Sequence, residues 1–180
     1  DVCSSDLILI SSNLERLLYL STGCDAEQTA KLMNQLGTEG HYTVTPEMKA
    51  KMADFCGGFA TEAEDAAAIR ELYDETGYVI DTHTGVASAV YQQYKKNTGD
   101  ETKTVIASTA SPYKFSRSVM EAISDEKLPE DEFAVIDELC RVSGVEIPKA
   151  VEEIRNAQIR HKLECDVQDM KKTVAKILGI

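Results

Sequence analysis

The sequence predicts an α/β protein in which a mostly parallel sheet with flanking helices is followed by an all-helical tail. From residue 8 to about 123, short apolar runs alternate with helical patterns, which is typical of strand–helix units around a parallel sheet. Hydroxyl-rich turns follow two of these runs, and from about residue 129 the pattern is helical only. We therefore predict three parts: a leader at 1–7, an α/β domain at 8–128 and a helical region at 129–180.

The first predicted element is a buried strand that ends in the apolar run at 7–10. Residues 1–6 before it are polar and aperiodic, which favours a foreign or damaged leader on a truncated chain over a frayed terminus. Ser12 as N-cap and Glu15 three residues later form a predicted capping box, so a helix should begin there. The turn from a strand into a capped helix exposes backbone N–H groups, which suits an anion.

The next predicted elements alternate between helices and strands. Pro46 favours a helix start, and Thr61 with Glu64 forms a second capping box for a helix that Gly77 ends. Short strands are predicted at 78–80 and 104–107, each followed by a turn and a further helix. In an open parallel sheet such turns lie at the edge where ligands bind.

The helical region is predicted to contain helices at 129–139, 148–159 and 166–178. The acid-rich stretches at 62–75 and 125–138 are most simply solvated helix faces.

Composition excludes several classes of function. The formal charge is −12 and the pI is about 4.7, which argues against binding duplex nucleic acid or an anionic membrane surface. No apolar run approaches the roughly 18 residues that cross a bilayer. The five cysteines are widely spread without a C-x-x-C pair, so free thiols in a cytoplasmic protein are expected.

Few patterns indicate chemistry. The histidines His41, His83 and His161 lie far apart without ligand-spaced partners, so no metal site is predicted, and no phosphate-binding glycine motif occurs. The turns at 81–85 and 108–115 offer hydroxyls, an imidazole and nearby basic groups to a polar ligand. Helix capping within these turns, by Asp81 or Thr82 in the first and by Ser111 or Ser116 in the second, is the alternative interpretation.

Three blocks of the sequence together resemble the threonine synthase family. They are ISSNLERLL at 10–18, DTHTGVA at 81–87 and STASPYKF at 108–115, and they occur in the family's order. The resemblance covers roughly residues 8–178 and corresponds to the C-terminal part of the enzyme. It implies the fold-type-II architecture of pyridoxal-phosphate enzymes and the conversion of O-phospho-L-homoserine and water into L-threonine and phosphate.

The resemblance also implies roles for single residues. The hydroxyl of Thr109 is expected to meet the pyridine nitrogen of pyridoxal 5'-phosphate. Substrate contacts are expected from Ser12, Asn13, Arg16, His83 and Lys114.

No catalytic residue is predicted in the chain itself. The family's Schiff-base lysine stands in a Ser-Phe-Lys-Asp context, and neither this context nor the family's glycine-rich phosphate loop occurs in these 180 residues. We therefore expect the full-length enzyme to be active and this chain alone to be inactive. The alternatives are another fold-type-II enzyme, such as one similar to threonine dehydratase, and a non-catalytic binding module. The oligomeric state is left open.

Overall fold

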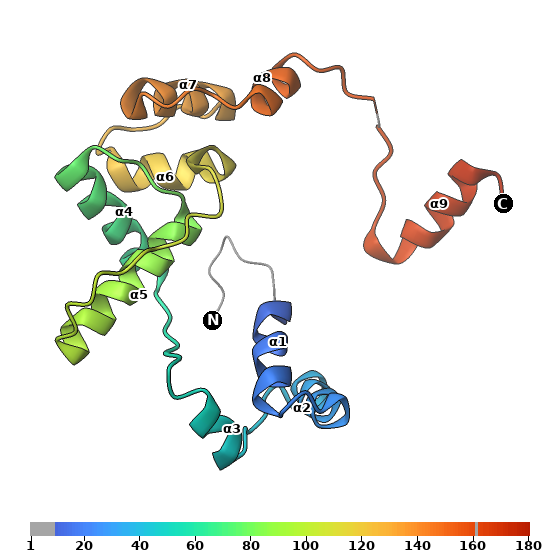
Figure 1. The fold of residues 1–180 in the computed structure, drawn as a ribbon. Helices are drawn as coiled ribbons and strands as arrows, with labels where there is room; N and C mark the ends of the chain where they lie inside the picture. The colour runs from blue at the N-terminus through green and yellow to red at the C-terminus, as the bar shows by residue number, and fades with distance from the viewer. Residues whose placement is uncertain (1–9, 161) are drawn as a thin grey trace. The chain divides into compact units, whose positions relative to one another are not determined.

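The computed structural model describes residues 10–160 and 162–180, and this part of the chain consists of helices and connecting loops (Figure 1). The chain divides into two compact units, Asp1–Val145 and Glu146–Ile180. The first unit contains α1 (Ser12–Ser21), α2 (Ala26–Glu39), α3 (Pro46–Lys51), α4 (Glu62–Thr76), α5 (Thr82–Thr98), η1 (Pro112–Phe115), α6 (Ser116–Ile123) and α7 (Glu132–Ser143). The second contains α8 (Lys149–Arg155), η2 (Val167–Asp169) and α9 (Met170–Leu178).

The first three helices pack around a small apolar core. Leu18 on α1, Leu32 on α2 and Met48 on α3 are almost fully buried, and α1 contacts both other helices. Pro46 is the first residue of α3, where its missing N–H costs nothing, so the helix start predicted from this proline is confirmed.

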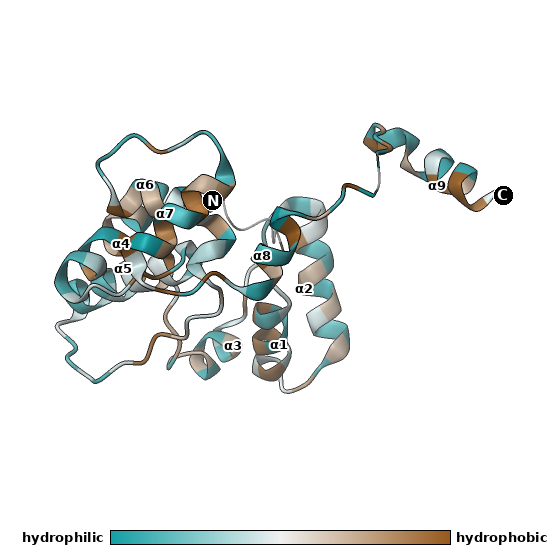
Figure 2. Cartoon of the chain, turned by 90° about the horizontal axis from the view of Figure 1, so that it is seen from above, coloured by the Kyte–Doolittle hydropathy of each residue, from teal (hydrophilic) through white to brown (hydrophobic). Residues whose placement is uncertain are grey.

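A second group of helices in the first unit holds the larger core. Helix α4 contacts α5 and α6, and α6 contacts α7 (Figure 1). Helix α7 contributes Val135, Ile136 and Leu139 to this core, and these side chains lie on one face of the helix. Figure 2 shows these helices with hydrophilic residues on their outer faces.

The predicted parallel sheet is wrong for the part of the chain that the structure describes, which contains no β-strand. The runs at 78–80 and 104–107 lie in loops. In the first run Val79 and Ile80 are buried, whereas Val105 in the second is 90% exposed. A short apolar run has the same composition as a strand or as a buried loop, and only a neighbouring strand makes it part of a sheet.

Several predicted helix boundaries are confirmed and others are wrong: the helices predicted at 129–139 and 148–159 are Glu132–Ser143 and Lys149–Arg155. Thr61 and Glu64 form the predicted capping box of α4, and Gly77 ends that helix with a φ of 73°. Ser12, however, is not the N-cap of α1, because the side chain of Ser11 accepts the backbone N–H of Leu14 at 3.4 Å. A capping box needs Glu or Gln three residues after the N-cap. Because the N-cap is Ser11, that position is Leu14, and Glu15 is one residue too far along to complete the box.

The second unit is described by itself. Helix α9 carries Met170, Val174, Ile177 and Leu178 at helical spacing, and these side chains are at least half exposed. In the described residues no helix has the length and apolar character needed to span a membrane. The predicted leader at 1–7, most of the apolar run at 7–10 and His161 lie outside the described residues. The predicted domain boundary at 128 stays a prediction, and the structure separates its two units after Val145.

Candidate functional site

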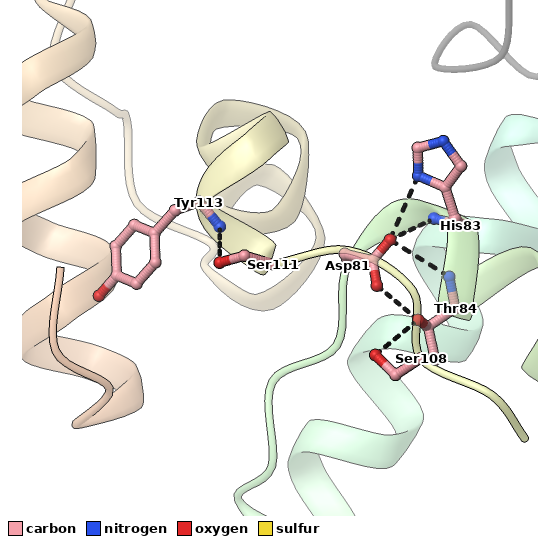
Figure 3. Close-up of polar contacts among 6 residues, drawn as sticks. All are labelled: Asp81, His83, Thr84, Ser108, Ser111 and Tyr113. Atoms are coloured by element: carbon pink, nitrogen blue, oxygen red, sulfur yellow. Dashed lines mark hydrogen bonds and ion pairs between the residues drawn. The ribbon is translucent and has the colours of Figure 1, made fainter. Parts of the chain in front are cut away.

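The start of α5 is organised around one buried carboxylate. Asp81 is the N-cap and is 0% exposed. Its Oδ1 accepts the backbone N–H of His83 at 2.9 Å and that of Thr84 at 3.4 Å (Figure 3). Because these N–H groups have no partner inside the helix, the carboxylate satisfies them and also meets the positive end of the helix dipole. The capping interpretation of Asp81 is therefore confirmed.

A chain of hydroxyls connects the two predicted turns. The Thr84 hydroxyl contacts Oδ2 of Asp81 and lies 3.0 Å from the Ser108 hydroxyl (Figure 3). A hydroxyl has only one proton, so when Thr84 donates to the carboxylate, Ser108 must donate to Thr84. The turn at 81–85 and the turn beginning at Ser108 thus lie side by side, although 24 positions separate their bonded residues.

His83 and Lys114 lie near the same aromatic ring. The Nδ1 atom of His83 is 3.2 Å from Oδ1 of Asp81, and its ring centroid is 5.6 Å from that of Phe115. The Nζ atom of Lys114 lies 5.3 Å from the Phe115 centroid. An imidazole and an exposed ammonium group near one aromatic ring offer N–H donors to an anionic ligand.

Thr109 directly follows Ser108 in the chain and is exposed. The second serine-rich position, Ser111, accepts the backbone N–H of Tyr113 at 3.2 Å and caps η1 (Figure 3). The capping interpretation of Ser111 is confirmed. Tyr113 is buried and donates from its hydroxyl to the carbonyl of Val145, which fixes η1 against the end of the first unit.

The other predicted site residues form a separate group on α1. Ser12, Asn13 and Arg16 are exposed in its first turns, and the Arg16 guanidinium donates to the side-chain oxygen of Asn13. A guanidinium beside free backbone N–H groups at a helix start is suited to phosphate or carboxylate.

Asp65 on α4 was not predicted from the sequence as a site residue. Its predicted place on a solvated acidic face is wrong, because Asp65 is only 8% exposed. Its Oδ1 has no hydrogen-bond partner in the described part of the chain. Burial, together with the nearby charge of Asp81, raises the pKa of Asp65 to about 6. The available signal was position, since Asp65 precedes the buried Ala68 and Ile69 by three and four residues on the same helix face.

Gly85 explains why Asp65 and α5 come so close. A Cβ at Gly85 would lie 2.0 Å from Oδ1 of Asp65 and 2.8 Å from Cγ1 of Ile69. Only glycine therefore lets α5 approach α4 at this point. Among the described residues, no group of three or more histidine, cysteine, aspartate or glutamate side chains is arranged to hold a metal ion.

Loss of the hydroxyl should change the stability of the chain differently at Thr82 and Thr84, the two threonines near the start of α5. Thr84→Val removes the donor to the Asp81 carboxylate and should lower the free energy of unfolding by about 1.5 kcal/mol, as expected for a hydrogen bond to a charged group. Thr82→Val removes a buried hydroxyl without a partner in the described chain, so it should be neutral or slightly stabilising. Urea unfolding of both variants measures the difference, and equal losses would contradict the bonded role of Thr84.

Comparisons with known proteins agree with this arrangement. Residues 84–162 match a family model described as threonine synthase, C-terminal. A threonine synthase-like 1 protein of Homo sapiens is 34% identical over 124 residues, which are 68% of this chain and 16% of that protein. The threonine synthase of Schizosaccharomyces pombe is 35% identical over 129 residues, which are 65% of this chain and 25% of that protein.

A solved structure is similar to this chain over most of its length. A crystal structure of pyridoxal-phosphate-bound threonine synthase from Brucella melitensis matches 76% of this chain and 28% of its own, with a TM-score of 0.56 and 29% identity. Over the matched part, the chain therefore has a fold similar to that of a segment of a pyridoxal-phosphate enzyme. More narrowly, the resemblance of this chain to the C-terminal portion of threonine synthase is confirmed. The chain spans only 16% to 25% of the length of the two curated relatives given above.

Proposed function

We propose that this chain is the C-terminal portion of a cytoplasmic threonine synthase that converts O-phospho-L-homoserine and water into L-threonine and phosphate. The similarity to curated threonine synthases and to a pyridoxal-phosphate-bound member supports this proposal most directly. The alternatives, a different enzyme of the same fold type and a non-catalytic binding module, are tested by the experiment below.

Pyridoxal 5'-phosphate would be the cofactor of the full-length protein, where it supplies an electron sink when bound. The exposed, neutral hydroxyl of Thr109 fits the pyridine nitrogen of such a group. Ser108, its neighbour, is hydrogen-bonded to Thr84 and so fixes the backbone from which Thr109 extends. In this proposal Thr109 orients the ring, and no residue of this chain forms the covalent bond to it.

The start of α1 would bind the anionic part of the substrate. Arg16 is held by Asn13 on the exposed face of the first turns, and the backbone N–H groups of Ser12 and Asn13 point out of the helix end. A guanidinium offers two parallel donors to a phosphate, which an ammonium group cannot do. His83 and Lys114 would contact the substrate near the start of α5, where Nδ1 of His83 lies 3.2 Å from Oδ1 of Asp81.

The sharpest test is an assay of two proteins side by side. The 180-residue chain alone should release no phosphate from O-phospho-L-homoserine, because it contains no lysine in the family's Ser-Phe-Lys-Asp context. The full-length protein that contains the chain should form threonine. In it, Arg16→Met should raise KM roughly 10–100-fold, since charge-assisted hydrogen bonds contribute about 1.5–3 kcal/mol. The control Arg141→Met removes an arginine that pairs with Glu138 on α7, and its KM should not change.

Each outcome decides between the candidates. Deamination of threonine by the full-length protein, without use of O-phospho-L-homoserine, would favour the related-enzyme alternative. An open reading frame that starts near Asp1 would favour the binding module, because the lysine would then be missing from the gene. Threonine formation by the isolated chain would overturn the proposed inactivity.

A further inference from the structure

A cavity of about 370 Å³ lies between α4, the start of α5 and α6. Three carboxylates line it, from Glu62, Asp65 and Glu121, together with the hydroxyl residues Thr82 and Ser118. Alanine, isoleucine and phenylalanine side chains form the rest of the wall, and no basic side chain is among the described residues that line it. The cavity is therefore negatively charged with apolar patches.

Two buried polar side chains in this wall lack partners. Thr82 is 5% exposed and Asp65 is 8% exposed, and neither the Thr82 hydroxyl nor Oδ1 of Asp65 has a hydrogen-bond partner in the described chain. Both residues line the cavity, and Oδ1 of Asp65 lies close to Gly85. Folded proteins rarely leave buried polar atoms unpaired, so an unpaired hydroxyl and an unpaired carboxylate oxygen on two residues of one cavity wall indicate that a donor can bind there.

No basic side chain among the described residues that line the cavity serves as a counter-ion for Asp65. Asp81 and His83 lie at the start of α5, where the imidazole is next to the Asp81 carboxylate. The guanidinium of Arg70 on α4 is held by the carbonyl of Ile123 at 3.0 Å and by Asp125. The acidic groups Glu62 and Glu121 add to the negative potential, and Lys114, beside Phe115, does not line the cavity.

We propose that this cavity binds a small organic cation with a primary ammonium group on a short aliphatic chain. An ammonium group has three N–H donors and no acceptor, so it matches a wall that presents carboxylate and hydroxyl oxygens. The aliphatic chain would pack against the Ile69 and Phe115 side chains. The absence of a metal-binding group of three among the described residues favours an organic cation over a metal ion. The proposal does not depend on the proposed function.

Binding should depend on pH because it requires the ionised form of Asp65. Burial and the charge of Asp81 raise the pKa of this carboxyl to about 6, so it is mostly ionised at pH 8 and mostly protonated at pH 5. The cation therefore binds more weakly as the pH falls.

Calorimetric titration of the 180-residue chain with n-butylamine tests whether the cavity binds an ammonium group. n-Butanol serves as the neutral probe of the same shape. We expect saturable binding of the amine at pH 8, about 10-fold weaker binding at pH 5, and no binding of the alcohol. Asp65→Asn should weaken amine binding about 10-fold at pH 8, and Thr82→Val should weaken it less. Glu71→Gln makes the same charge change at an exposed position of α4 outside this cavity, so its affinity should equal that of the unchanged chain.

Circular dichroism of each variant confirms that it is folded before titration. The proposal is overturned if n-butanol binds as well as n-butylamine, because the cavity then recognises only apolar surface. It is equally overturned by an amine affinity that Asp65→Asn and Glu71→Gln change to the same extent. Absence of saturable binding at amine concentrations of roughly 10 mM, where even a weak site of about 4 kcal/mol is filled, would also overturn it.

Discussion

Replacing Gly85 with alanine is expected to lower the free energy of unfolding by about 2–3 kcal/mol, near the upper end of the range for overpacking a core. The added Cβ would overlap Oδ1 of Asp65 at 2.0 Å and Cγ1 of Ile69 at 2.8 Å. Neither side chain can move freely, since Ile69 is 1% exposed and Asp65 is buried beside it. Urea unfolding at neutral pH measures the loss.

Gly37→Ala is the matched control for this substitution. Gly37 also lies inside a helix, α2, but a Cβ there would meet nothing within 4 Å. Alanine should therefore stabilise the chain by roughly 0.5–1 kcal/mol through helix propensity alone. Combining Gly85→Ala with Asp65→Ala should cost less than the sum of the two single changes, because the second removes the overlapping oxygen. Simple additivity would show that the two helices separate by another route.

Asp65→Asn is expected to stabilise the chain at pH 8 by on the order of 2 kcal/mol and to have little effect near pH 4. The pKa of Asp65 is raised from 3.8 to about 6 by burial and by Asp81, so the folded state binds the proton more tightly than the unfolded state. Its contribution to stability is fully present below pH 3.8 and is lost as the pH rises through about 6. Asparagine has the same shape and cannot ionise, so it should remove this loss.

Unfolding curves at several pH values between 4 and 8 measure this effect. For Asp65→Asn the difference from the unchanged chain should grow across the interval around pH 6. Glu71→Gln makes the same charge change at an exposed position of the same helix and serves as the control. A constant difference for Asp65→Asn would mean that Asp65 has an ordinary pKa in the folded chain.

The features that were predicted correctly from the sequence depend on residues close together in the chain. The capping box of Thr61 and Glu64, the helix end at Gly77 and the helix start at Pro46 each need only three or four consecutive positions. A sheet needs partners that are distant in the sequence. The buried run with Val79 and the exposed run with Val105 look alike in composition, and only the three-dimensional arrangement separates them.

The candidate site could be predicted in part for the same reason. The motif at 81–85 contains Asp81, His83 and Thr84, and a cap at Asp81 follows from local spacing. The hydrogen bond between Thr84 and Ser108 joins two motifs that the sequence could only place separately. Asp65 was assigned to a solvated face because acidic residues surround it, whereas the close approach of α5 at Gly85 buries it.

The exposed apolar segment at 104–107 has a consequence for how the chain behaves in solution. Val105, at 90% exposure, offers neighbouring molecules an apolar contact, while the formal charge of −12 keeps molecules apart. Salt screens this repulsion over a distance of about 10 Å at 0.1 M but leaves the apolar attraction intact. Colloidal stability should therefore be greatest at low ionic strength and smallest as the pH approaches the pI of about 4.7, where the repulsion vanishes.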